Sequence, residues 1–193
     1  GQSINKKKFK YIMKSIPTHI IVILDQRFLE ASTMKNPLDG IDYLNYPNLV
    51  ILRSMNNFYS IENLTIGYII SNIKLAELID SKTLVDDIDS FTAKLAIDSL
   101  KDRVYIRNTK KLIKSQNQSM TKDLKKHNID FIPSETNYLL IEANRSRGDV
   151  AEDLERENMI LYESIDEVDD YWTLPISMKS DVNTKVINIL NYS

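Results

Sequence analysis

The chain has no cysteine and only two histidines, His19 and His127, among its 193 residues. The absence of cysteine excludes disulfides, thiolate metal sites and cysteine nucleophiles. Two histidines also argue against a histidine-based metal site. We therefore expect no metal centre.

Long apolar runs are missing as well. No run approaches the roughly 20 residues that a membrane-spanning helix needs, and the first residues lack the hydrophobic stretch of a signal peptide. With 25 basic and 27 acidic residues, the net charge of −2 gives no whole-chain sign of a polyanion partner. We therefore expect a cytoplasmic protein with neither a membrane nor a nucleic-acid partner.

What is present is an ordinary globular composition, 42% hydrophobic and 27% charged. The length has room for one domain or two small ones. Residues 19–24, 48–52 and 64–70 are apolar runs without alternation, which is typical of strands buried on both faces of a parallel sheet. A helix is predicted over residues 3–15, and two or three helices in series over 72–127.

The second half combines shorter elements. Strands are predicted at 130–133, 137–141, 159–162 and 171–177, and helices at 148–157 and 181–192. Ser180 or Asp181 is the expected N-cap of the last helix. The pattern predicts an α/β first part, residues 1–105, and a smaller α+β part, residues 106–193.

Three segments resemble one family. They are Ile20–Phe28 (IIVILDQRF), Asn48–Tyr68 (NLVILRSMNNFYSIENLTIGY) and Pro133–Leu140 (PSETNYLL). They are similar to three patterns of fold-type I pyridoxal-phosphate-dependent aminotransferases of class I/II, especially histidinol-phosphate aminotransferases and threonine-phosphate decarboxylases. The first pattern is an apolar strand ending in Asp-Glu-Ala-Tyr/Phe. The second is an apolar strand followed by Arg/Thr-Ser-x-Ser/Thr-Lys, and the third is Pro-Ser-x-x-Asn-Phe-Leu-Leu.

The resemblance implies only the C-terminal half of such a protein, because Gly1-Gln2-Ser3 resembles the end of the family's Asn-Pro-x-Asn-Pro-Thr-Gly turn. Residues 1–105 would be the C-terminal part of the cofactor-binding large domain, with a partial, mostly parallel sheet, and 106–193 the small C-terminal domain. A partial sheet leaves an open edge and an uncovered apolar face. We therefore expect a homodimer, or a heterodimer with another aminotransferase-like chain.

The family's cofactor is pyridoxal phosphate, which a lysine holds as a Schiff base. By the resemblance this lysine position is Asn57, whose amide can neither form that bond nor act as a general base. Eight residues later, the family's phosphate-binding arginine is replaced by Thr65. A neutral hydroxyl recognises a dianion less well than a bidentate cation does.

Other cofactor positions are partly kept. Asp25 matches the carboxylate beside the ring nitrogen, although a strand-end Asp also serves as a helix cap or loop acceptor. Phe28 stands where the family usually has Tyr, Ser54 keeps a phosphate-side hydroxyl, and Asn56 replaces the hydroxyl beside the lysine. Thr173 aligns best with the arginine that binds the substrate carboxylate.

Arg53 falls within the second pattern, but we expect it to pair with a carboxylate. Taken together, the substitutions predict an aminotransferase-like domain that has lost its chemistry and serves a structural, dimerising or regulatory role. Two alternatives are an active aminotransferase or amino-acid decarboxylase completed by a missing half or a partner chain, and a module that binds phosphorylated metabolites.

Overall fold

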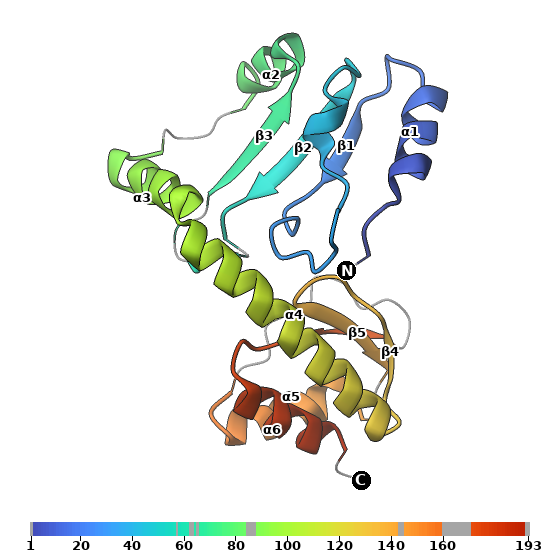
Figure 1. Cartoon of the computed structure of the whole chain (residues 1–193), viewed down its shortest axis with the longest axis vertical. Coiled ribbons are helices and arrows are strands. Elements are labelled where there is room, and N and C mark those ends of the chain that lie inside the picture. The colour runs from blue at the N-terminus through green and yellow to red at the C-terminus, as the bar shows by residue number, and fades with distance from the viewer. Residues whose placement is uncertain are drawn as a thin grey trace. The chain divides into compact units, whose positions relative to one another are not determined.

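The computed structural model describes residues 2–56, 58–61, 64, 66–83, 88–142, 145–159 and 171–191 (Figure 1). The chain forms two compact units. The first unit is Ser3–Thr109, and the second unit is Lys110–Ser193 together with Gly1–Gln2. Helix α4, Arg103–Lys126, begins in the first unit and ends in the second. The division predicted after residue 105 falls within α4 and stays a prediction.

The first unit contains a sheet of three strands in the order β1 (Val22–Asp25), β2 (Leu49–Ser54) and β3 (Gly67–Ser71). Strands β1 and β2 are parallel, but β3 runs antiparallel to β2. The α/β class is confirmed, while the third strand differs from the parallel expectation. The reason lies in its connection: a parallel neighbour needs a long crossover, usually a helix. The described residues between β2 and β3 form no helix.

One face of this sheet is packed against helix α1, Lys6–Ser15. Asn5 caps α1 by accepting a hydrogen bond from the Lys7 N–H, and Phe9 and Met13 lie four residues apart on its buried side. These two side chains pack with residues of one face of the sheet, namely Val22, Leu24, Leu49, Ile51 and Ile70.

The opposite face is covered only in part. Alternation along the strands places Ile21, Ile23 and Ile69 there, and they are 53%, 63% and 36% exposed. We call this side of the sheet, with these three exposed isoleucines, the open face. Val50, on the same side of the central strand, is buried. Among the described strands, β1 is an edge strand, with β2 as its single neighbour.

The segment between β1 and β2 folds back onto the packed face. It contains the short 3₁₀ helix η1, Gly40–Tyr43, which Asp39 caps through the Ile41 N–H. Gln26 holds this segment, since its Nε2 donates to the Leu38 carbonyl at 2.6 Å and its Oε1 accepts from the Gly40 N–H at 3.0 Å. A Cβ at Gly40 would lie 2.8 Å from Ile51 side-chain atoms, so a larger residue here would force the packed Ile51 side chain to shift.

In the described residues, three helices lie between β3 and the next strand, in agreement with the predicted series. They are α2 (Ile73–Asp80), α3 (Ser90–Lys101) and α4. Asn72 and Asp89 cap the first two, and Asp102 accepts hydrogen bonds from two backbone N–H groups at the start of α4. No helix in the described ranges is both long enough and apolar enough to cross a bilayer.

The second unit has an antiparallel sheet in the order β4 (Asp130–Ile132), β5 (Tyr138–Glu142) and β6 (Trp172–Pro175). Helices α5 (Arg147–Arg156) and α6 (Ser180–Leu190) complete it. Its core includes Met120 and Leu124 of α4, Leu139 and Ile141 of β5, Val150 and Leu154 of α5, and Val186, Ile187, Ile189 and Leu190 of α6. Residues 160–162 of the strand predicted at 159–162 lie outside the described residues, and Met159 is not in a strand.

The start of α6 differs from the prediction. Lys179, rather than Ser180 or Asp181, is the N-cap, and its side chain makes no capping hydrogen bond. The Asn183 amide instead accepts from the Ser177 N–H and donates to the Ser177 carbonyl, both at 2.8 Å. The predicted cap was wrong because this side chain within the helix anchors the preceding loop.

Candidate functional site

The described candidate residues of the first unit gather where β1 and β2 end. Asp25 is the last residue of β1 and Ser54 the last residue of β2. Asp25 lies opposite Leu52 in the parallel register, so strand alternation places Asp25 and Ser54 on the same face, which is also the open face. Phe28 follows in the turn after β1 and is half-buried. Asn57 and Thr65 lie outside the described residues.

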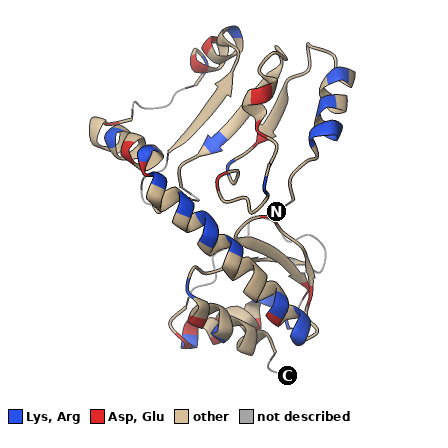
Figure 2. Cartoon of the chain, viewed as in Figure 1, with Lys and Arg blue, Asp and Glu red and all other residues tan. Residues whose placement is uncertain are grey.

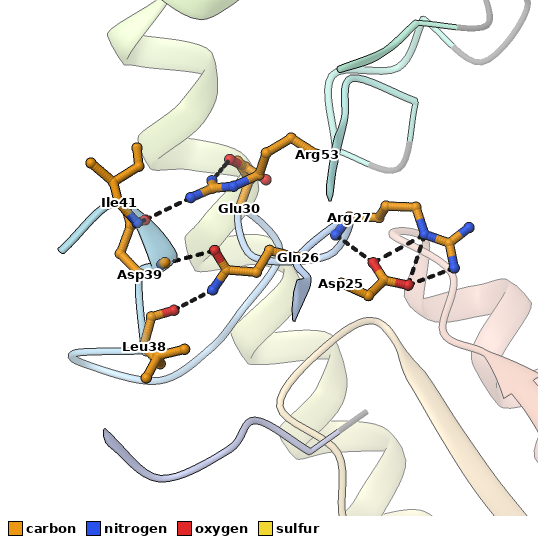
Figure 3. Close-up of polar contacts among 9 residues, drawn as sticks. Asp25, Gln26, Arg27, Glu30, Leu38, Asp39, Ile41 and Arg53 are labelled. Carbon is orange, nitrogen blue, oxygen red and sulfur yellow. Dashed lines mark hydrogen bonds and ion pairs between the residues drawn. The ribbon is translucent and has the colours of Figure 1, made fainter. Parts of the chain in front are cut away.

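The Asp25 carboxylate forms an ion pair with the Arg27 guanidinium (Figure 3). Arg27 Nε donates to both carboxylate oxygens at 3.1 and 3.0 Å, and Nη2 donates to Oδ2 at 2.7 Å. The backbone N–H of Arg27 adds a bond to Oδ1 at 3.0 Å. The side-chain hydrogen bonds from Arg27 hold the pKa of Asp25 below its usual value. Asp25 is therefore an ionised acceptor within its own turn.

Ser54 and Asn56 are also bonded locally. Ser54 Oγ accepts from the Asn56 N–H at 3.1 Å and lies 3.4 Å from Asn56 Oδ1. Asn56 Oδ1 accepts from the Ile66 N–H at 3.0 Å, across the loop that joins β2 to β3. The two side chains thus stabilise the loop that contains position 57.

A partly buried ion cluster, in which the Asp39 side chain is 41% exposed, lies on the opposite face of the sheet (Figure 3). The Arg53 guanidinium donates to Glu30 Oε1 through Nη1 and to Asp39 Oδ1 through Nη2, both at 2.8 Å. Only 6% of the Arg53 side chain is exposed. The expected pairing of Arg53 with a carboxylate is confirmed. This cluster joins the segment after β1 to the central strand.

A tyrosine borders this cluster. Burial raises the pKa of Tyr59 to about 12, and the negative charge of Glu30 adds to the shift. The Tyr59 hydroxyl is therefore protonated at neutral pH. It can donate or accept a hydrogen bond there, but it is no base.

Thr173 belongs to the second unit. It lies on β6 opposite Leu140 of β5 and is half-buried. Its hydroxyl carries no charge, so it can offer a carboxylate at most one hydrogen bond and no ion pair.

Positive charge gathers elsewhere in the chain, along α1 and α4 (Figure 2). Near the ends of β1 and β2, the two described arginines are Arg27 and Arg53, and each is paired with carboxylates. In the described ranges, no group of three or more His, Asp or Glu residues could hold a metal ion.

These contacts test whether pyridoxal phosphate fits the described residues. The ring nitrogen needs a carboxylate, but the carboxylate of Asp25 is already paired with the Arg27 guanidinium. The phosphate needs cations and free donors, but Ser54 and Asn56 are used in their own loop. In the described residues, the buried side-chain atoms without a hydrogen-bond partner are Glu30 Oε2, Arg53 Nε, Asn137 Oδ1 and Arg147 Nε, and none of them belongs to a candidate cofactor residue. The described residues do not fit the group.

Three residues near the site were not singled out in the sequence, namely Gln26, Arg27 and Glu30. A signal was available for two of them. In place of the family's Asp-Glu-Ala-Tyr/Phe, the chain has Asp25-Gln26-Arg27-Phe28, which changes the second and third positions. Comparing these positions with the pattern would have indicated a local partner for Asp25.

Comparisons with known proteins agree with the resemblance. The sequence model of "Aminotransferase class I and II" matches residues 1–168. The chain is 26% identical over 150 residues to histidinol-phosphate aminotransferase 2 of Pseudomonas fluorescens, which covers 77% of this chain and 40% of that protein. The chain thus spans about two fifths of the length of this curated relative.

Solved structures show the same fold. The histidinol-phosphate aminotransferase of Clostridium acetobutylicum superposes with a TM-score of 0.86 at 26% identity, covering 98% of this chain and 59% of that one. The L-threonine-O-3-phosphate decarboxylase of Porphyromonas gingivalis gives a TM-score of 0.81 at 16% identity, covering 97% and 58%. With a family match over most of its length, the chain belongs to the class I and II aminotransferases, a family whose cofactor is pyridoxal phosphate.

Proposed function

We propose that this chain is an aminotransferase-like domain without pyridoxal phosphate chemistry, and that it serves as the structural partner of an aminotransferase-like chain, a second copy or a separate protein. The observation that carries the proposal is the bonding of Ser54 and Asn56 to each other and to the Ile66 N–H. Groups that would bind a phosphate are used to hold their own loop.

The residue types support the same conclusion. Asn57, aligned with the family's lysine, has no amine to bond to the cofactor's aldehyde. Thr65 and Thr173 replace two arginines with neutral hydroxyls, so neither an anionic phosphate nor a substrate carboxylate meets a cation at those positions. Losses at three positions with different tasks favour a decayed site over a single exchanged residue.

The partner role is supported by the open face. Parallel strands are found in sheets with both faces covered, whereas Ile21, Ile23 and Ile69 are exposed here. The chain also spans about two fifths of the length of a curated relative, so much of the fold is not contained in it. A second polypeptide, or the remainder of a longer one, would bury these isoleucines. The cytoplasmic location stays a prediction.

The first experiment is to add pyridoxal phosphate to the longest natural form of the protein, dialyse it exhaustively and record the near-visible absorbance. We expect no retained cofactor band. The histidinol-phosphate aminotransferase of Clostridium acetobutylicum, treated in the same way, is the control for a family member with the same fold.

A retained band that borohydride bleaches would contradict the proposal, because it would mean that some lysine holds the cofactor. Peptide mapping would then identify this lysine. Retention only after mixing with a partner chain would instead favour an active enzyme completed by that chain. Thermal stabilisation by phosphorylated metabolites without any retained band would favour a binding module.

A further inference from the structure

We propose that the Arg27 guanidinium, by pairing with the Asp25 carboxylate, keeps the protonated ring nitrogen of pyridoxal phosphate from binding to Asp25. Restoring a lysine at position 57 would then be insufficient to restore binding of pyridoxal phosphate. The inference rests on the proposed function, since it explains a second, independent reason why the cofactor site is closed.

The geometry is that of a complete ion pair. Three side-chain contacts of 2.7 to 3.1 Å join the guanidinium to both carboxylate oxygens. The Arg27 backbone N–H also donates to Oδ1, so four donor contacts converge on one carboxylate. Figure 3 shows the two side chains facing each other within a single turn.

Chemistry favours the internal cation over a ring. A guanidinium stays charged at every pH at which the protein is folded, and it offers two donors in a planar fork. A pyridinium offers one N–H donor, and its charge depends on the carboxylate that it would have to share. A ring approaching Asp25 would also meet the positive charge of Arg27, which opposes its protonation.

Proximity strengthens the internal pair. Arg27 follows Asp25 by two residues, so it reaches the carboxylate without any loss of translational freedom, whereas a free ligand must lose that freedom to bind. The side chains of Arg27 and Asp25 are 50% and 47% exposed. A ligand can therefore reach the carboxylate and compete for it, and the outcome is a matter of relative affinity.

The family pattern adds a sequence argument. At the position of Arg27 the pattern has alanine, whose methyl group cannot pair with a carboxylate. The chain thus differs from the pattern at the residue that now neutralises Asp25, in addition to Asn57 and Thr65. The replacement of alanine by Arg27 affects the part of the site that would bind the cofactor's ring nitrogen.

The test compares Asn57→Lys with Asn57→Lys/Arg27→Ala. The dissociation constant for pyridoxal phosphate is measured by equilibrium dialysis, and cofactor fixed by borohydride is counted by mass spectrometry. We expect the double variant to bind about tenfold more tightly, which corresponds to roughly 1.4 kcal/mol. Arg27→Gln in the same background keeps part of the stem and guards against a folding defect of the alanine variant.

The matched control is Asn57→Lys/Lys94→Ala. It removes the same charge from another exposed pair of the first unit, Lys94–Asp98, whose atoms lie 2.8 Å apart. This variant should bind like Asn57→Lys alone. Equal affinities in all these variants, including no measurable binding by any of them, would overturn the inference.

A second readout does not depend on the cofactor. In Arg27→Ala the pKa of Asp25, followed by carboxyl NMR, should rise, because the side-chain hydrogen bonds from Arg27 that lower it are lost, while the backbone N–H of residue 27 remains. An unchanged pKa would show that the pair is not formed in solution. Binding by the unmodified chain would refute the proposed function, whereas failure of the double variant alone would refute only the role of Arg27.

Discussion

The two sheets of this chain bury their apolar residues to different extents. In the second unit, β5 has Leu139 and Ile141 at 1% and 0% exposure, packed against helices on the inner face. In the first unit, β1 places Val22 and Leu24 in the core but leaves Ile23 63% exposed on the other side. The apolar side chains of β5 in the second sheet are buried, whereas the first sheet leaves apolar side chains such as Ile23 exposed to solvent.

Strand direction explains this difference. An antiparallel sheet can have one face in the core and one in water, so β4, β5 and β6 need only one covering layer. A parallel pair such as β1 and β2 belongs to folds with helices on both faces, and its sequence is apolar on both. The first unit therefore exposes apolar residues on one face of its sheet, whereas the apolar residues of β5 in the second unit are buried.

The largest loss of stability is expected for a substitution in the core of the second unit. Ile141→Ala removes a fully buried side chain and should lower the free energy of unfolding by about 4 kcal/mol. Urea denaturation followed by fluorescence of the single tryptophan, Trp172 on β6, measures this unit. Ile23→Ala, the same change on the open face, should cost less than about 0.5 kcal/mol. Because Trp172 belongs to the second unit, this loss is measured by hydrogen exchange of the β1 and β2 amides in the first unit. Similar losses for both variants would contradict the contrast.

The ion cluster of the first unit gives the next effect. Arg53→Ala leaves the mostly buried Glu30 without its cation, and loss of one partner of such a pair should cost about 3 kcal/mol. The Asp39 side chain is 41% exposed and adds little to this cost. Hydrogen exchange of the β1 and β2 amides should accelerate, while the β5 amides keep their protection. Arg27→Ala, which removes the cation of an exposed pair, is the control and should cost at most about 1 kcal/mol.

The smallest effect on stability, but a specific one on association, is expected at the open face. Ile23→Lys should change the unfolding free energy by less than about 0.5 kcal/mol, because this side chain is 63% exposed. If the partner is a second copy, sedimentation velocity should show dimers of the unmodified chain and monomers of the variant.

The control is Ile97→Lys, which changes an isoleucine of α3 that is 50% exposed and should leave association intact. An unmodified chain that is monomeric at every concentration would exclude a second copy and leave a separate chain as the partner. Dimers of equal strength in both variants would place the interface away from the open face.

Much of the fold was predictable because its strands fall on unalternating apolar runs. The antiparallel direction of β3 was not, because direction depends on how the intervening loop folds rather than on the composition of the strand. The cap of α6 was missed for a related reason. Asn183, within the helix, anchors Ser177, whereas a capping rule considers only the residues at the start.

The positions of the site residues at the strand ends were predicted from the sequence, but most of their hydrogen-bond partners were not. The runs placed Asp25 and Ser54 at strand ends, and Arg53 was expected to find a carboxylate. Its partners Glu30 and Asp39 lie 23 and 14 residues earlier in the chain, a separation that no local pattern identifies. Arg27 could have been found only from its departure from the alanine of the family pattern, because an arginine two residues from an aspartate is common on surfaces and has no periodic signature.

Gly40 shows how unevenly the fold constrains the sequence. Its backbone is held by Gln26, and its single hydrogen faces Ile51 and Leu24 at a distance where a methyl group would overlap with both. In terms of mutational tolerance, any larger residue at position 40 forces the Ile51 and Leu24 side chains to shift, whereas position 23 accepts many residues. A deep mutational scan scored for stability alone would therefore outline the packed face of the first sheet sharply and leave the open face almost blank. Residues that the scan recovers on the open face only in the presence of a partner would map the contact that we propose for that face.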